Sequence, residues 1–138
     1  MNEFFAFAAE THLVTVRVSP RFLPDQSDPQ QGRYTWSYHI RIENRAPGAV
    51  QLTRRHWFIT DANGRVEEVE GPGVVGETPR IEPGFSFDYV SGCSLQTPSG
   101  TMHGSFRMET VRGSFDAAIP KFNLISPPAR PKPASKPK

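Results

Sequence analysis

The sequence contains one cysteine, Cys93, among 138 residues, so no disulfide can form within the chain. A lone cysteine is typical of proteins from reducing compartments, and we expect a cytoplasmic protein. Residues 1–10 lack a basic start followed by a long apolar run, which indicates that no secretory signal is present. A membrane-spanning helix needs about 20 apolar residues, and no stretch approaches that length, so we expect no membrane insertion.

A strong charge excess is also missing from most of the chain. The formal net charge is +2 at pH 7, but the last 12 residues hold four basic side chains and no acidic one (Arg130, Lys132, Lys136 and Lys138). Residues 1–126 therefore carry 12 basic and 14 acidic side chains, a formal charge of −2. Proteins that coat nucleic acid need a basic total or a basic face. We therefore expect no nucleic-acid partner, although residues 1–126 could still carry a local basic patch.

No ten-residue window combines helical apolar spacing with freedom from helix-breaking residues, and an alternating pattern dominates instead. Its clearest example is Tyr34–Glu43, in which aromatic or aliphatic residues alternate with polar ones, as in a half-buried strand. A strand near Leu52–Asp61 contains three large apolar residues in a row, Trp57 to Ile59, and is expected to be partly buried on both faces. Further alternating segments are Val14–Ser19, Phe85–Tyr89, Met102–Glu109 and Phe115–Ile119.

Turn residues separate these segments. Asn63-Gly64 predicts a two-residue hairpin, because both residues tolerate positive φ. Pro47-Gly48 and Pro83-Gly84 fit type II turns, in which proline fixes φ and glycine supplies the positive φ. The pattern predicts an all-β protein, a fibronectin type III-like or immunoglobulin-like β-sandwich of about seven strands. The missing cysteine pair favours the fibronectin type III-like form.

We expect one folded domain, residues 1–126, with a polar loop at Phe22–Gly32 between two strands. Residues 127–138 are rich in proline and lysine and contain no large apolar side chain. Such a segment cannot offset its ordering entropy by burial, so we predict a disordered tail.

The segment Gly71–Gly76, GPGVVG, matches the G-x-G-x-x-G pattern of dinucleotide-binding loops. That chemistry requires a helix directly after the loop, and Pro79 and Pro83 prevent one. Three interpretations stay open, one of which is a contact with a protein or a peptide. The segment is a tight β-connection that needs glycine for close approach or positive φ. Alternatively, it is a ligand-binding cradle of backbone amides at Gly71, Gly73 and Gly76, with Arg80 or Arg55 as counter-charge for a phosphate.

Catalytic and metal-binding patterns are absent. The sequence has no G-x-S-x-G motif and no H-E-x-x-H motif, and its scattered histidines (His12, His39, His56 and His103) lack ligand spacing. His39 and His103 would converge only if their strands were neighbours. Cys93 would need a base and a lowered pKa to act as a nucleophile, and we expect a small buried side chain instead. We therefore predict no enzyme, no cofactor and no bound metal.

The run Arg54-Arg55-His56-Trp57 is the one short basic and aromatic cluster that we single out. Alternation places Arg55 and Trp57 on one face of a strand and Arg54 and His56 on the other. The cluster fits a strand that packs Trp57 inward, and it also fits a contact with an anion or an acidic peptide, since arginine forms bidentate bonds with carboxylates.

The sequence resembles the ApaG family over nearly all of residues 10–125. The segments that carry the resemblance are Leu52–Gly64, Glu68–Pro79, Pro83-Gly84, Tyr89–Leu95, Pro98–Gly104 and Phe115–Leu124. The resemblance implies a fibronectin type III-like sandwich, a bacterial cytoplasmic protein or the same module in a eukaryotic one, and an association with magnesium and cobalt efflux. It also implies a protein-binding module. We accordingly predict a non-enzymatic module with an unknown protein partner, and phosphate or nucleotide binding at Gly71–Gly76 as the alternative.

Overall fold

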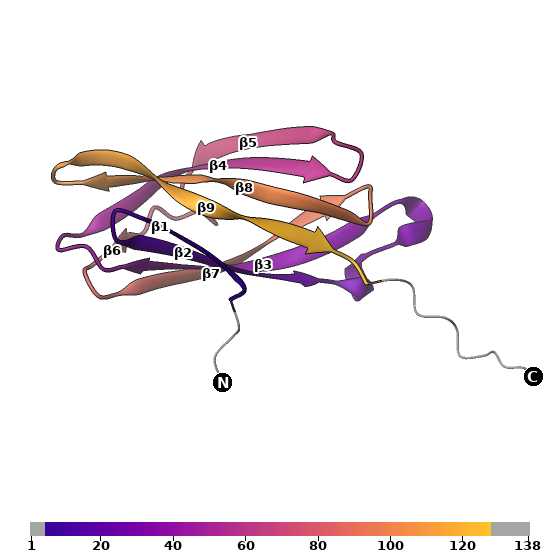
Figure 1. Cartoon of the computed structure of the whole chain (residues 1–138), viewed down its shortest axis with the longest axis horizontal. Coiled ribbons are helices and arrows are strands. Elements are labelled where there is room, and N and C mark those ends of the chain that lie inside the picture. The colour runs from indigo at the N-terminus through magenta and orange to yellow at the C-terminus, as the bar shows by residue number, and fades with distance from the viewer. Residues whose placement is uncertain (1–4, 128–138) are drawn as a thin grey trace, which may run out of the picture.

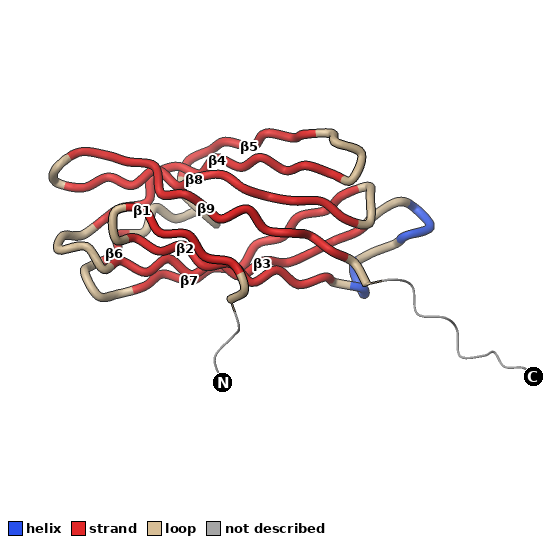
Figure 2. Tube along the Cα trace, in the orientation of Figure 1, coloured by secondary structure: helices blue, strands red, loops and turns tan. Residues whose placement is uncertain are grey.

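The computed structural model describes residues 5–127, and most of this part is β-strand (Figure 1, Figure 2). Two short 3-10 helices, η1 (Pro24–Gln26) and η2 (Pro29–Gln31), lie in the polar loop. The predicted tail lies outside the described residues except for Pro127, and its disorder stays a prediction. The strands are β1 (Phe7–Thr11), β2 (Val14–Phe22), β3 (Tyr34–Asn44), β4 (Val50–Asp61), β5 (Val66–Pro72), β6 (Arg80–Ile81), β7 (Ser86–Leu95), β8 (Ser99–Thr110) and β9 (Gly113–Ile125).

Two antiparallel sheets pack face to face, which confirms the predicted all-β sandwich. One sheet has the strand order β1-β2-β3-β7, and the other has the order β5-β4-β8-β9, with β6 paired to β4. The predicted alternation decides which side chains enter the core: Trp36, Tyr38, Ile40 and Ile42 of β3 are buried, while the polar residues that alternate with them are only partly buried. Within residues 5–127, no helix is long and apolar enough to span a membrane.

The turns agree with the sequence only in part. Pro83-Gly84 forms a type II turn, since Gly84 has a φ of 83° and the N–H of Phe85 donates to the carbonyl of Glu82. The type II prediction for Pro47-Gly48 is wrong, because Gly48 does not have positive φ. There the side chain of Asn44 shapes the loop, donating from Nδ2 to the carbonyl of Gly48 at 3.0 Å and accepting at Oδ1 from the N–H of Ala46 at 2.9 Å.

The hairpin predicted at Asn63-Gly64 exists, but its loop has three residues rather than two. Asp61 faces Arg65, and only Gly64, the last loop residue, has positive φ. The carboxylate of Asp61 accepts hydrogen bonds from the N–H groups of Asn63 and Arg65 and supports the longer turn. This loop length sets the pairing of β4 with β5.

The sandwich is closed along one side and open along the other. On the closed side β9 packs against β1 and β2, and the N–H of Ala118 donates to the hydroxyl of Thr11 at 3.0 Å. The edge strands of the opposite side are β7 in one sheet and β5 in the other. The interior of the sandwich is therefore less covered between these two edges than on the closed side.

Candidate functional site

A groove with a volume of about 520 Å³ lies at the open side, between β5 and β7. Its apolar floor is formed by Tyr38, Trp57, Tyr89 and Met102. The rings of Tyr38 and Trp57 lie 5.4 Å apart between their centroids, so the two sheets meet beneath the groove. Clefts of this size are typical of ligand sites.

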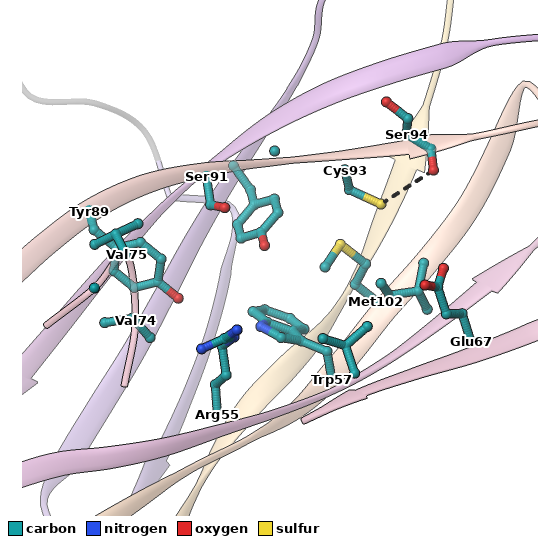
Figure 3. A pocket seen from close by; sticks show the side chains of 15 residues that line it. Arg55, Trp57, Glu67, Val74, Val75, Tyr89, Ser91, Cys93, Ser94 and Met102 are labelled. Carbon is teal, nitrogen blue, oxygen red and sulfur yellow. Dashed lines mark hydrogen bonds between the residues drawn. The ribbon is translucent and has the colours of Figure 1, made fainter. Parts of the chain in front are cut away.

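Polar side chains replace apolar ones on the inner faces of the strands that line the groove. Arg55 and Trp57 share the inner face of β4, as the alternation predicts. Glu67 lies across from Ile59, and Ser91 lies across from Tyr38 in its own sheet. Figure 3 shows Arg55 and Glu67 well separated in the groove, with Trp57 and Met102 between them. Burying these charges in a closed apolar core would cost much free energy. The groove is therefore a polar opening between the two sheets.

The backbone of the Gly71–Gly76 loop holds the side chain of Arg55. Its Nη1 donates to the carbonyl of Pro72 at 2.7 Å and to that of Gly73 at 3.0 Å. No carboxylate of the described residues forms an ion pair with it. Arg55 therefore presents a positioned guanidinium whose charge is not neutralised within residues 5–127.

The Gly71–Gly76 loop has the geometry of a tight connection. Val74 and Glu77 exchange two backbone hydrogen bonds of 2.8 Å, and between them Val75 and Gly76 have φ of 43° and 80°. A Cβ on Gly73 would lie 2.1 Å from the carbonyl oxygen of Glu77. Valine rarely adopts positive φ, so Val75 is a conformational outlier at the lip of the groove.

The predicted ligand-binding residues have different positions. Gly76 lines the groove, while Gly71 lies beneath the guanidinium of Arg55. Gly73 makes the bend, and its N–H donates to the carbonyl of Thr53 at 2.8 Å, so it is not directed at a ligand. Arg80 does not line the groove, and its Nε donates to Glu82 at 2.8 Å. Of the two arginines considered from the sequence, Arg55 is the one in the groove.

The tyrosine hydroxyls and the cysteine thiol of the groove wall stay protonated near neutral pH. Burial raises the pKa of Tyr38 and of Tyr89 above the ordinary tyrosine value. Burial, together with the carboxylate of Glu67, raises the pKa of Cys93 to about 11. The groove therefore offers neutral hydroxyl and thiol groups and the charges of Arg55 and Glu67, an arrangement suited to binding.

Sequence spacing gave no indication of a cluster on the outer face of β4 and β5. His56, Glu68 and Glu70 place their ligand atoms within 4.8 Å of one another. Nε2 of His56 lies 2.6 Å from Oε2 of Glu68, and Glu70 faces Arg54 at 4.0 Å. Glu68 and Glu70 share one face of β5, and the register of the β4–β5 hairpin brings His56 of β4 beside them.

The two histidines considered as a pair from the sequence, His39 and His103, do not converge. His39 belongs to β3 and His103 to β8, so they lie in different sheets and on the outer faces that polar residues of those strands share. The ring of His103 stacks on Phe58 at 5.1 Å between centroids. Phe58 is thereby half-buried on the outer face, as the three apolar residues in a row predict.

A second hollow, with a volume of about 570 Å³, lies among the loops at one end of the sandwich. It is lined by His12, residues 46–50 and residues 110–115. At its rim Val111 is 99 % exposed, at the tip of the hairpin that joins β8 to β9. This end is thus a second hollow with an exposed apolar side chain at its rim.

The model of one family, described as the ApaG domain, matches residues 24–110. The chain is 50 % identical over 128 residues to a protein named Protein ApaG from Rhodospirillum centenum, covering 92 % of this chain and 98 % of that one. It is 52 % identical over 122 residues to Protein ApaG from Rhizobium etli, covering 88 % of this chain and 94 % of that one. A crystal structure from Bordetella pertussis, described as an ApaA protein, superposes with a TM-score of 0.80 at 46 % identity, covering 83 % of this chain and 94 % of that one.

Proposed function

Because the chain belongs to the ApaG domain family, we propose that it is a non-enzymatic, cytoplasmic binding module that contacts another protein. The observation that carries this proposal is the groove between two edge strands, in which Arg55 is positioned but not neutralised. Exposed edges of β-sheets are natural docking sites for extended segments of other proteins. The raised pKa of Cys93 supports the non-enzymatic part, since a thiol nucleophile reacts as the thiolate.

A site-specific photo-cross-linker tests this function in cells. The cross-linker replaces Val90 on β7 in one variant and Val111 at the loop end in another, because both side chains are well exposed. We expect a discrete adduct with another protein from at least one position, absent without irradiation. If both variants fold and neither yields an adduct above the dark control, the proposed function is wrong.

The alternative is a phosphate or nucleotide ligand at Gly71–Gly76. Arg55 supports it as a nearby counter-charge, but the N–H groups of Gly73 and Val74 already donate to the carbonyls of Thr53 and Glu77. Titration of labelled protein with pyrophosphate and ATP tests it. Amide shifts in residues 71–76 at millimolar ligand would favour this alternative over protein binding at the groove.

We propose an indirect association with magnesium and cobalt efflux, in which the chain itself holds no metal ion. His56, Glu68 and Glu70 are satisfied by one another and by Arg54, and their exposed carboxylates can stay hydrated. Calorimetry with Mg²⁺ and Co²⁺ is expected to give no binding heat. Binding that disappears in Glu68→Gln would replace this with a direct role.

A further inference from the structure

The edge strand β7 is less protected against strand addition than the other sheet edges, since its one charged residue, Asp88, is paired with Arg41 of the neighbouring strand β3. Proteins commonly protect exposed edges with short strands, charges or proline. β1 has only five residues, β5 carries three glutamates and a proline, and β9 carries Pro120-Lys121. β7 has ten residues, pairs with β3 along its length, and contains neither lysine nor proline. Within residues 5–127 it is therefore the edge best suited to accept another strand.

The part of β7 beside the groove also permits close approach. Residues 91–94 are Ser, Gly, Cys and Ser, which leave little side-chain bulk above the strand. Gly92 packs closely on the neighbouring strand, since a Cβ at this position would lie 3.2 Å from the carbonyl oxygen of Trp36. A segment added here would direct every second side chain into the groove, because side chains alternate along a strand.

The charges in the groove select the chemistry of those side chains. Arg55 is the one basic residue among those that line the groove, and no described carboxylate neutralises it. A carboxylate matches the guanidinium in charge and geometry. Next to Arg55 along the groove lie Trp57 and Met102, which are almost fully buried and form an apolar floor against which an apolar side chain can pack (Figure 3). Alternate residues of a strand are about 7 Å apart, so an acidic and an apolar residue two positions apart would occupy both places.

Val75 provides an independent indication that this surface binds something. Its φ of 43° places a β-branched residue in the left-handed region, and its side chain is 52 % exposed at the groove lip. Such conformations are disfavoured and cluster at ligand clamps and switch regions. The conformation holds an apolar side chain at the position where an incoming segment would pass Tyr89.

We propose that β7 accepts an extended peptide segment of a partner protein as an added strand, and that Arg55 binds an acidic side chain of this segment. An apolar residue two positions from the acidic one packs on Trp57 and Met102. This inference rests on the proposed function, since it specifies where the module binds and what chemistry the partner must carry.

Selection from a phage-displayed library of random nine-residue peptides tests the inference. We expect the selected sequences to share Asp or Glu two positions from an apolar residue. A synthetic peptide of the selected sequence is then titrated onto the intact chain by fluorescence anisotropy. Arg55→Gln is expected to weaken binding about tenfold or more, since a charge-assisted bidentate contact is lost.

Arg54→Gln is the matched control, because Arg54 neighbours Arg55 on the opposite face and faces Glu70. It should change the affinity less than about twofold, as exposed ion pairs contribute little. Replacing the peptide's acidic residue by its amide should weaken binding to the unaltered chain and cause no further loss with Arg55→Gln. The measurement on the unaltered chain does not depend on the folding of a variant.

Amide shift mapping with the same peptide on the unaltered chain completes the test. Shifts are expected in residues 89–94 and 67–69. A failed selection, neutral selected peptides, or shifts confined to residues 110–113 would overturn the groove inference while leaving the proposed function standing. A peptide that maps to the groove, combined with no cross-linked partner in cells, would contradict the proposed function alone.

Discussion

The guanidinium of Arg55 lies over Gly71, its partner across the β4–β5 ladder, so closely that a Cβ on residue 71 would come within 3.0 Å of Nη2. The first glycine of the GPGVVG pattern therefore makes room for an arginine. The second is needed for a bend with positive φ, and the third for a two-residue turn. All three glycines have structural reasons that do not involve a nucleotide.

We expect Gly71→Ala to separate binding from stability. The atoms that the new Cβ meets are the flexible end of Arg55, so the free energy of unfolding should fall by less than about 1 kcal/mol. The displaced guanidinium should weaken the selected peptide nearly as much as Arg55→Gln does. Urea unfolding and anisotropy measure the two effects. Gly48→Ala, where the Cβ meets nothing within 4 Å, is the control, and unchanged affinity in Gly71→Ala would contradict the positioning role.

Gly104→Ala should instead damage the fold. Its Cβ would lie 1.9 Å from the carbonyl oxygen of His56, a backbone atom that cannot move without breaking the β4–β8 ladder. We expect a loss of about 3 kcal/mol or more in the free energy of unfolding, measured in urea. Ser105→Ala, the next residue, should lose less than about 1 kcal/mol. Comparable losses in both variants would show that the close approach at Gly104 is not the cause.

Val75→Asn is expected to stabilise the protein. Asparagine tolerates the left-handed conformation, which costs other residues about 1–2 kcal/mol, so the free energy of unfolding should rise by about 1 kcal/mol. Val66→Asn, a similarly exposed valine in β5, should lower stability slightly, because asparagine disfavours strands. Thermal unfolding of both variants gives the comparison. A larger loss at residue 75 than at residue 66 would mean that Val75 is not strained.

Stability should fall in alkaline solution as Cys93 ionises. Its pKa rises from an ordinary value of 9.0 to about 11 in the folded chain, so the folded state holds the proton more tightly than the unfolded state. The resulting stability is complete below pH 9 and is lost as the pH rises through 11. Tyr38 and Tyr89 act in the same direction at higher pH.

Urea unfolding of the unaltered chain and of Cys93→Ala between pH 8 and pH 11 measures this contribution. The unaltered chain should lose more stability over that range than the variant does. Iodoacetamide at pH 8 should modify Cys93 more slowly than a free thiol, because little thiolate is present. Equal pH slopes in the two proteins would contradict the raised pKa.

The sequence predicts the strands well because alternation directly records which residues enter a core. It identifies β3 with little ambiguity and places Arg55 on the inner face with Trp57. It does not identify β1, whose five residues form too short a pattern. Two identical Pro-Gly dipeptides behave differently, since the side chain of Asn44 determines the loop at Gly48 and nothing local reveals that contact.

The positions of Arg55 and His56 in the candidate sites depend on the length of one turn, the loop between β4 and β5. A two-residue loop at Asn63-Gly64 would pair Arg55 with Pro72, whereas the observed three-residue loop pairs it with Gly71. A shift of one residue exchanges the faces of a strand. The same shift decides that His56 faces Glu70. The carboxylate of Asp61, which holds the longer turn, was the sequence signal that would have corrected the register.

The two tryptophans give the chain a built-in optical reporter. Trp57 forms part of the groove floor, while Trp36 is buried elsewhere and donates from Nε1 to the carbonyl of Ile125 at 3.0 Å. A molecule entering the groove would change the emission and the quenching of Trp57 and leave those of Trp36 as an internal reference. In a Trp36→Phe background the remaining signal reports occupancy without any attached dye.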